Sequence, residues 1–140
     1  MDLEQCINFV LTRAQQSVHQ LFKAEVAPFG VTPGQYAVLK CLWDENGQTA
    51  KQIADRLGLD ASTVTGILDR MEQKGLIEKR VDPKDRRALK VLLTPKGEGL
   101  KDPLNEAIDS ANRKALQGLS EEESETLRRI LMNMAGMTLK

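Results

Sequence analysis

The spacing of hydrophobic positions changes twice between residues 49 and 94, and its order predicts a helix, a tight turn, a second helix and a β-hairpin. In both predicted helices apolar residues recur every three to four positions, and Gly58 interrupts the pattern between them. Only Leu59 separates this glycine from a helix cap at Asp60, so the two helices have to cross at a steep angle. We therefore predict a helix-turn-helix whose second helix spans about 61–74.

The apolar positions then alternate, as is typical of β-strands, over residues 77–81 and again over 89–94. The connecting sequence, D-P-K-D-R-R, places Pro83 where a type I turn favours it. From Lys79 to Lys90 there are six basic and two acidic residues, a local net charge of +4 in a chain of net charge +0. The pattern predicts a hairpin over about 77–94 with a basic tip. With the two helices, it predicts a winged helix-turn-helix, which places one helix in the major groove of DNA.

Further helices are predicted on both sides of this unit. A broad apolar stripe at helical spacing predicts a helix over about 2–26, and either the same chain or a second subunit could cover it. A capping box with proline at the first position predicts a helix over about 32–43. Residues 94–116 predict a long helix in which Pro103 causes a kink or marks a boundary. Ser120 is the predicted cap of the last helix, and Thr49 is the predicted cap of the helix that ends at Gly58.

Composition narrows the class of protein. The 140 residues are 41% hydrophobic and 29% charged, which fits one domain, or one domain with appended helices. The apolar runs are far shorter than a membrane span, and the start of the chain lacks the pattern of a signal peptide, so we expect a cytoplasmic protein. Cys6 and Cys41 are then expected to stay reduced, and with His19 as the single histidine no metal site or cofactor is expected.

The outward face of the second helix carries short hydroxylated residues and a glycine in its first two turns, where an ordinary surface helix favours Glu and Lys. Small side chains allow close approach to another surface, and hydroxyl groups can bind phosphates or base edges. Asp60, Ser62 and Thr63 are also good N-terminal capping residues, so local helix chemistry is an alternative explanation. The face therefore points to DNA mainly because a basic hairpin follows it.

The chain resembles the MarR family of transcriptional regulators. The resemblance covers nearly the whole sequence and is carried by V-T-P-G-Q-Y-A-V-L, by L-D-R-M-E-Q-K-G-L-I-E-K-R and by D-P-K-D-R-R-A-L-K-V-L-L-T-P-K-G. It implies one MarR-type domain, mainly α-helical with a small β-hairpin wing. In this arrangement, residues 31–97 form the winged helix-turn-helix, and residues 1–30 and 98–140 form dimerisation helices. The resemblance also implies a homodimer that binds a palindromic operator in double-stranded DNA, most simply as a repressor.

The resemblance further implies three groups of DNA-contacting residues: at helix starts, along the recognition helix (about 61–74) and at the tip of the wing (about 77–94). These residues are Thr32, Gln35, Thr49, Lys51, Ser62, Thr63, Thr65, Gly66, Arg70, Lys84, Asp85, Arg86 and Arg87. Arg87, with Arg86, would enter the minor groove, and Asp85 would support that arginine through a salt bridge.

Some relatives respond to small aromatic or phenolic effectors in a crevice beside the dimerisation helices. Arg13, His19 and Trp43 are the candidate lining residues here. Other relatives sense peroxides through a cysteine in the first helix, with tyrosines nearby. Cys6 is expected in that helix, about two residues away from the corresponding position and without a tyrosine close by in the sequence. Thiol-based redox sensing is therefore an alternative to ligand sensing.

Two other classes of function fit the sequence less well. A winged-helix module that binds protein would favour apolar exposed residues on its second helix and a hairpin tip without paired arginines, and this chain has the opposite pattern. An enzyme would be expected to carry a recognised catalytic or nucleotide-binding motif, and the sequence contains none of the common ones.

Overall fold

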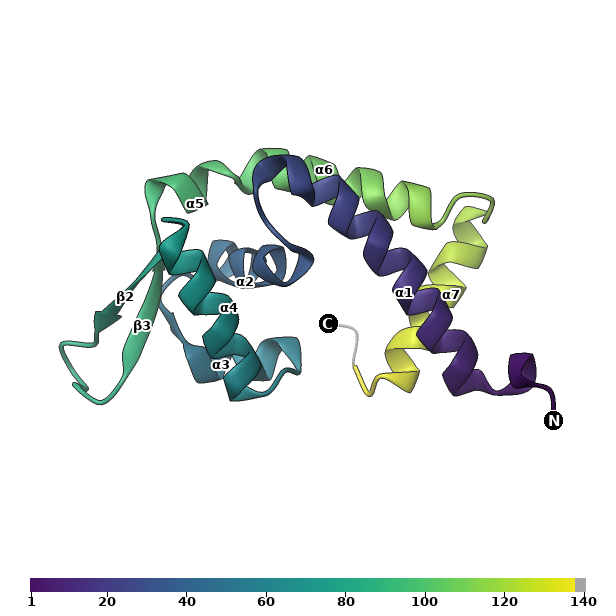
Figure 1. Ribbon diagram of the computed structural model, residues 1–140, viewed down its shortest axis with the longest axis horizontal. Helices are drawn as coiled ribbons and strands as arrows, with labels where there is room; N and C mark the ends of the chain where they lie inside the picture. Colours follow the sequence, from purple (N-terminus) through teal and green to yellow (C-terminus); the bar gives the residue numbers. More distant parts are fainter. Residues whose placement is uncertain (138–140) are drawn as a thin grey trace.

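The predicted order of helices and strands is confirmed in the computed structural model, which describes residues 1–137. The chain is mostly helical with one small antiparallel sheet (Figure 1). In order, the elements are η1 (Leu3–Gln5), α1 (Ile7–Val26), η2 (Ala27–Phe29), α2 (Pro33–Asp44), β1 (Gln48–Thr49), α3 (Ala50–Leu57), α4 (Ala61–Gln73), β2 (Ile77–Val81), β3 (Leu89–Leu93), α5 (Pro95–Gly99), α6 (Lys101–Ala115) and α7 (Glu121–Met134).

The predicted helix caps form as expected. The Thr32 hydroxyl accepts a hydrogen bond from the backbone N–H of Gln35 at 3.2 Å, and the Gln35 side chain accepts one in return from the Thr32 N–H. The same reciprocal pattern starts α3 at Thr49 and α7 at Ser120. Each capping box satisfies backbone donors that the first turn of a helix leaves without partners. These bonds fix where each helix begins.

The main core lies between α2, α3, α4 and the sheet. Its largest fully buried side chains include Leu39, Leu42, Ile53, Leu68 and Met71. In the sheet, β3 is the central strand, with β2 on one side and β1 on the other. The two-residue strand β1 was not predicted, because its pairing with β3 depends on contacts more than forty residues away in sequence. The core thus holds α4 and the β2–β3 hairpin as one unit.

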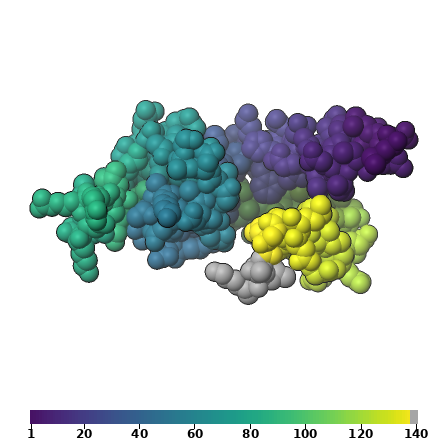
Figure 2. Space-filling model, turned by 90° about the horizontal axis from the view of Figure 1, so that it is seen from below, coloured from purple at the N-terminus to yellow at the C-terminus, as the bar shows by residue number. Residues whose placement is uncertain are grey.

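The flanking helices lie at the other end of the molecule. α1 packs along α6, and the chain reverses into α7, so that α7 and the N-terminus lie opposite the hairpin (Figure 1). In the space-filling view from below, α7 lies beside α1, and the hairpin projects from the far end (Figure 2). None of the helices in residues 1–137 is long and apolar enough to cross a membrane.

Two predicted helices are interrupted in the structure. The helix expected over 2–26 is broken at Cys6, where the backbone is extended between η1 and α1, so the cysteine precedes the helix instead of lying within it. The helix expected over 94–116 divides at Leu100 into α5 and α6. Pro103 lies in the first turn of α6, where its missing N–H costs no helical hydrogen bond. The proline therefore follows a boundary and does not kink a continuous helix.

Candidate nucleic-acid interface

The exposed face of α4 begins at a firmly capped N-terminus. The Asp60 carboxylate accepts hydrogen bonds from the Thr63 N–H at 2.7 Å and from the Ser62 hydroxyl at 2.8 Å. These bonds to its charged form hold the pKa of Asp60 below its ordinary value. Because the Ser62 hydrogen is directed at Asp60, the oxygen of Ser62 is free to accept a hydrogen bond from another group. Thr63 and Thr65 are exposed beside it.

Further along α4, Arg70 folds back over Gly66. A Cβ atom built on Gly66 would lie 3.8 Å from the nearest guanidinium nitrogen of Arg70. The glycine therefore leaves a flat stretch of backbone beside a positive charge, which suits close approach to the edge of a nucleic acid. The predicted groups on α4 are thus on one accessible face.

Two sets of contacts anchor α4 to the rest of the winged helix. Val64, Leu68 and Met71 are buried in the core. Lys79 of β2 forms ion pairs with Asp69 at 2.5 Å and with Glu72 at 3.9 Å, and its side chain is 21% exposed. This lysine links α4 directly to the hairpin, a contact that was not predicted from the sequence.

The tip of the wing is organised by its two aspartates. The Asp85 N–H donates to the Asp82 carbonyl at 3.2 Å, which closes the turn predicted at Pro83. The Asp85 carboxylate accepts a hydrogen bond from the Arg87 N–H at 3.1 Å and lies 3.5 Å from its guanidinium Nε. The expected ion pair between Asp85 and Arg87 is therefore present. The side chain of Arg87 is 94% exposed, and Lys84 and Arg86 are exposed beside it.

The residues predicted to contact DNA at the starts of α2 and α3 differ in how exposed their side chains are. Thr32 and Lys51 are exposed, and Thr49 is half-buried. Gln35 is only 2% exposed, so its side chain does not reach the surface where the predicted contact with DNA would form. Its amide oxygen is occupied by the Thr32 N–H and by Lys74 Nζ, at 3.2 and 2.9 Å. A polar side chain at a capping-box position can face either way, and here the contact with Lys74 turns it inward.

The candidate effector residues do not come together. A cavity of about 780 Å³ lies between α1, α7 and the start of α2, and its mostly apolar lining includes His19 but neither Arg13 nor Trp43. Arg13 is exposed on α1. The Trp43 indole N–H donates to the Gly97 carbonyl at 3.1 Å, and its ring packs against the main core. This bond gives Trp43 a structural role in place of the predicted contact with a ligand.

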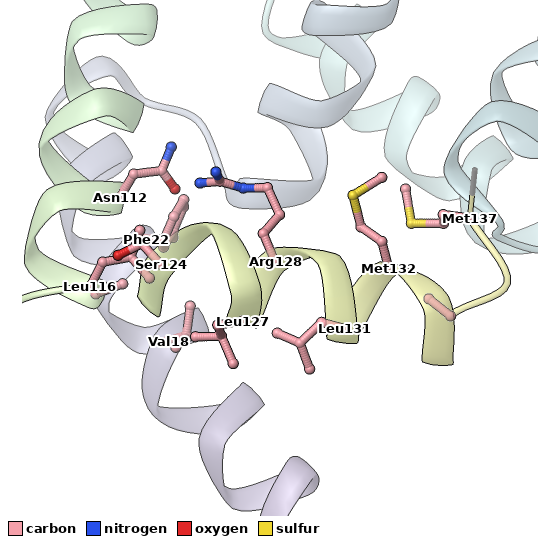
Figure 3. A pocket seen from close by; sticks show the side chains of 12 residues that line it. Val18, Phe22, Asn112, Leu116, Ser124, Leu127, Arg128, Leu131, Met132 and Met137 are labelled. Carbon is pink, nitrogen blue, oxygen red and sulfur yellow. The ribbon is translucent and has the colours of Figure 1, made fainter. Parts of the chain in front are cut away.

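A second cavity, of about 410 Å³, lies between α1, α6 and α7. Figure 3 shows Arg128 of α7 extending toward Asn112 of α6, with Val18, Leu127 and Leu131 along the apolar side. Both cavities open onto the faces of α1 and α7 that carry exposed apolar side chains.

The two cysteines lie in different surroundings. Cys6 is half-buried, and Cys41 is buried in α2, where burial raises the pKa of its thiol. Tyr36, the single tyrosine of the chain, is in contact with Trp43 within the winged helix.

Comparison with known proteins matches the MarR family model to residues 31–89. The transcriptional regulator MhqR of Bacillus subtilis is 31% identical over 128 residues, which are 89% of this chain and 88% of that protein. A probable transcriptional regulator from Pseudomonas aeruginosa is 35% identical and superposes with a TM-score of 0.89, covering 95% of this chain and 99% of its own.

The transcriptional repressor CouR has been solved in two relevant states. Bound to a 23-mer DNA duplex, it is 28% identical to this chain with a TM-score of 0.88, covering 95% of this chain and 94% of its own. CouR from Rhodococcus jostii RHA1 bound to p-coumaroyl-CoA is 27% identical with a TM-score of 0.83, covering 100% and 99%.

Proposed function

Since the chain belongs to the MarR family and is a DNA-binding transcriptional regulator, we propose that it acts as a homodimeric repressor of a palindromic operator. The observation that carries the proposal is the pairing of a small-residue, hydroxyl-rich face on α4 with an exposed, aspartate-supported arginine on the adjacent hairpin. Each protomer would place α4 in the major groove and the tip of the wing in a neighbouring minor groove. A regulator of this kind works beside the chromosome, in the cytoplasm.

The dimer is supported by apolar side chains that the protomer leaves exposed. Ile7 on α1 is 62% exposed and Met134 on α7 is 54% exposed, and both belong to a larger set at the same end of the molecule. The others are Leu3, Val10, Val18, Leu127, Ile130 and Leu131. A large exposed apolar surface is unusual on a monomer, and a second copy would bury it through a two-fold interface. Residues 1–30 and 98–140 would then form the dimerisation part.

The proposed DNA contacts keep the three groups of the sequence analysis, without Gln35. They are Thr32, Thr49, Lys51, Ser62, Thr63, Thr65, Gly66, Arg70, Lys84, Asp85, Arg86 and Arg87. In a two-fold dimer the two copies of α4 would contact half-sites about 34–36 Å apart, one turn of the double helix. Of these residues, Arg87 combines a side chain that is 94% exposed with an ion pair to Asp85, and it is the first to test.

Replacing Arg87 with alanine should weaken binding to the operator by about fivefold or more, since each arginine placed at a groove edge contributes roughly 1–3 kcal/mol. The matched control is Arg113→Ala, which removes an exposed arginine from α6, far from the wing. Fluorescence anisotropy on a duplex identified by genomic footprinting would measure both. Equal affinities for the wild type and the Arg87 variant would refute the role of the wing.

Thr65→Ala tests readout of bases by α4. The variant should lose more affinity for the operator than for random DNA of the same length, because a base contact carries sequence information and a phosphate contact does not. Equal losses on both duplexes would show that Thr65 does not read a base.

We also propose that a small aromatic or phenolic effector binds at the His19 and Pro33 end of the 780 Å³ cavity, beside the apolar side chains that the second copy would cover, and releases the DNA. The cavity is polar mainly at Gln15 and His19, and it lies between α1, α7 and the first residue of α2. A ligand there contacts both the proposed dimerisation part and the winged helix, so it could favour one relative orientation of the two. The complex of CouR with p-coumaroyl-CoA supports this type of control. The position of Cys6, outside α1 and far in sequence from Tyr36, favours ligand sensing over redox sensing.

A further inference from the structure

The turn between α4 and β2, residues 74–76, is hydrogen-bonded to both segments that connect the winged helix to the flanking helices. We propose that Lys74, within this turn, is a positioning residue that sets the angle of the recognition helix and thereby the half-site spacing that the dimer accepts. The inference rests on the proposed binding of a homodimer to a palindromic operator.

On one side, Lys74 is bonded to the segment that follows α1. Its Nζ atom donates to the Gly30 carbonyl at 2.8 Å and to the Gln35 side-chain oxygen at 2.9 Å. Gly30 has a φ of 73° and makes the bend between η2 and the start of α2. Gln35 in turn accepts the N–H of Thr32, so the lysine is connected to the whole capping box of α2. Hydrogen bonds from a charged donor are among the stronger ones, and two acceptors fix its direction.

On the other side, the same turn is bonded to the segment that leads into α6. Lys96 Nζ donates to the Lys74 carbonyl at 2.9 Å, and the Thr94 hydroxyl donates to the Gly75 carbonyl at 2.6 Å. The Thr94 N–H also donates to the Leu76 carbonyl at 3.1 Å. The turn at the C-terminal end of α4 is therefore hydrogen-bonded both to the segment that follows α1 and to the segment that precedes α6.

Because α4 is long, a small tilt at its Lys74 end would cause a large displacement at the end that is proposed to contact DNA. Twelve residues separate Lys74 from Ser62, which at 1.5 Å per residue is a lever of about 18 Å. A tilt of about 10° at the Lys74 end would move the Ser62 end by about 3 Å, close to the 3.4 Å rise of one base pair. A small loss of restraint at the turn would therefore let the recognition helix reach a half-site displaced by one position.

The test uses the full-length dimer and duplexes in which one base pair is added or removed between the half-sites of the footprinted operator. The wild type should bind the native spacing at least about tenfold more tightly than either altered spacing, since misplacing one half-site removes several base contacts. Lys74→Met keeps the length of the side chain and removes both hydrogen bonds, and it should reduce this ratio to about threefold or less. Lys74→Arg keeps a charged donor and should restore most of the preference. Lys101→Met removes an exposed lysine from the first turn of α6 and should leave the ratio unchanged.

The ratio separates positioning from simple contact with phosphate. If Lys74 only bound phosphate, its replacement would weaken all three duplexes equally, and an unchanged ratio would overturn the inference. If the wild type itself showed no preference for spacing, the proposed dimeric binding would fail, which is a different outcome.

A second measurement does not depend on DNA. A spin label at Ala61→Cys, at the end of α4 away from Lys74, in a background with Cys6→Ser and Cys41→Ala, reports the distance between the two recognition helices of the dimer. The distribution of distances should be broader with Lys74→Met than with Lys74. Distributions of equal width would overturn the inference, even if the variant were less stable.

Discussion

Gly97 offers a sharp test of how the winged helix is joined to the flanking helices. It lies in α5, and a methyl carbon in place of its hydrogen would be 2.2 Å from the Leu76 carbonyl oxygen and 3.2 Å from the Leu93 side chain. The first contact is with backbone, which cannot rotate away as a side chain can. Gly97→Ala therefore has to push α5 away from the turn between α4 and β2.

The cost can be estimated from the contacts that have to change. Overpacking of this kind costs about 2 kcal/mol. Moving the Leu76 carbonyl also weakens or breaks the hydrogen bond that it accepts from the Thr94 N–H. A buried polar group that loses its partner destabilises the fold by about 1–3 kcal/mol. Alanine has a better helix propensity than glycine, and this offsets about 1 kcal/mol of the destabilisation. We expect Gly97→Ala to lower the free energy of unfolding by about 2–4 kcal/mol.

Gly99→Ala is the matched control, because it lies in the same helix and a Cβ atom there meets no other atom within 4 Å. It should be neutral or more stable by up to about 1 kcal/mol. Urea unfolding of both variants at one fixed protein concentration would measure the difference, since the stability of the proposed dimer would depend on concentration. If the two variants unfolded within about 0.5 kcal/mol of each other, the close approach of α5 to the turn would not be a real constraint.

Three further outcomes are expected. The depressed pKa of Asp60 stabilises the fold at pH values above the ordinary pKa of an aspartate, and that stabilisation is lost as the pH falls through the depressed value. The excess stability of the wild type over Asp60→Asn should therefore shrink in acid, and a constant difference in urea midpoints would contradict this. Cys6 should react with a thiol reagent faster than Cys41, whose burial also raises its pKa; equal rates of absorbance change would count against the buried position. Trp43→Phe removes the shorter of two hydrogen bonds to the Gly97 carbonyl and leaves the one from the Leu100 N–H, so it should cost about 0.5–1.5 kcal/mol in unfolding free energy, measured by circular dichroism.

Features determined by neighbours in sequence could be predicted. The caps at Thr32, Thr49 and Ser120 each need two residues three positions apart, and all three form as expected. The turn at the tip of the wing and its ion pair likewise involve residues within a few positions of one another. Local hydrogen-bonding chemistry specifies such features whatever the rest of the chain does.

Features that depend on distant partners could not be predicted. Gln35 was expected at the DNA because it starts a helix, but Lys74, 39 residues later, holds its side chain inside. The strand β1 exists because β3 lies beside it, and neither the pattern nor the length of Gln48–Thr49 indicates a strand. The break at Cys6 is marked by no proline or glycine in the sequence. Only the assembled fold determines these positions.

The separation of charge along the molecule has a consequence for how it meets DNA. The basic hairpin lies at one end, and the three glutamates that open α7 lie at the other (Figure 1). A protomer with no net charge feels little overall pull toward a polyanion, but this arrangement gives it an electric dipole, and the field of DNA exerts a torque on a dipole. In the proposed two-fold dimer the parts of the two dipoles across the symmetry axis cancel and the parts along it add, so the torque would act on the dimer as a whole, at distances within a Debye length of about 8 Å in physiological salt. Orientation, more than attraction, would be what its charges contribute to the rate of association.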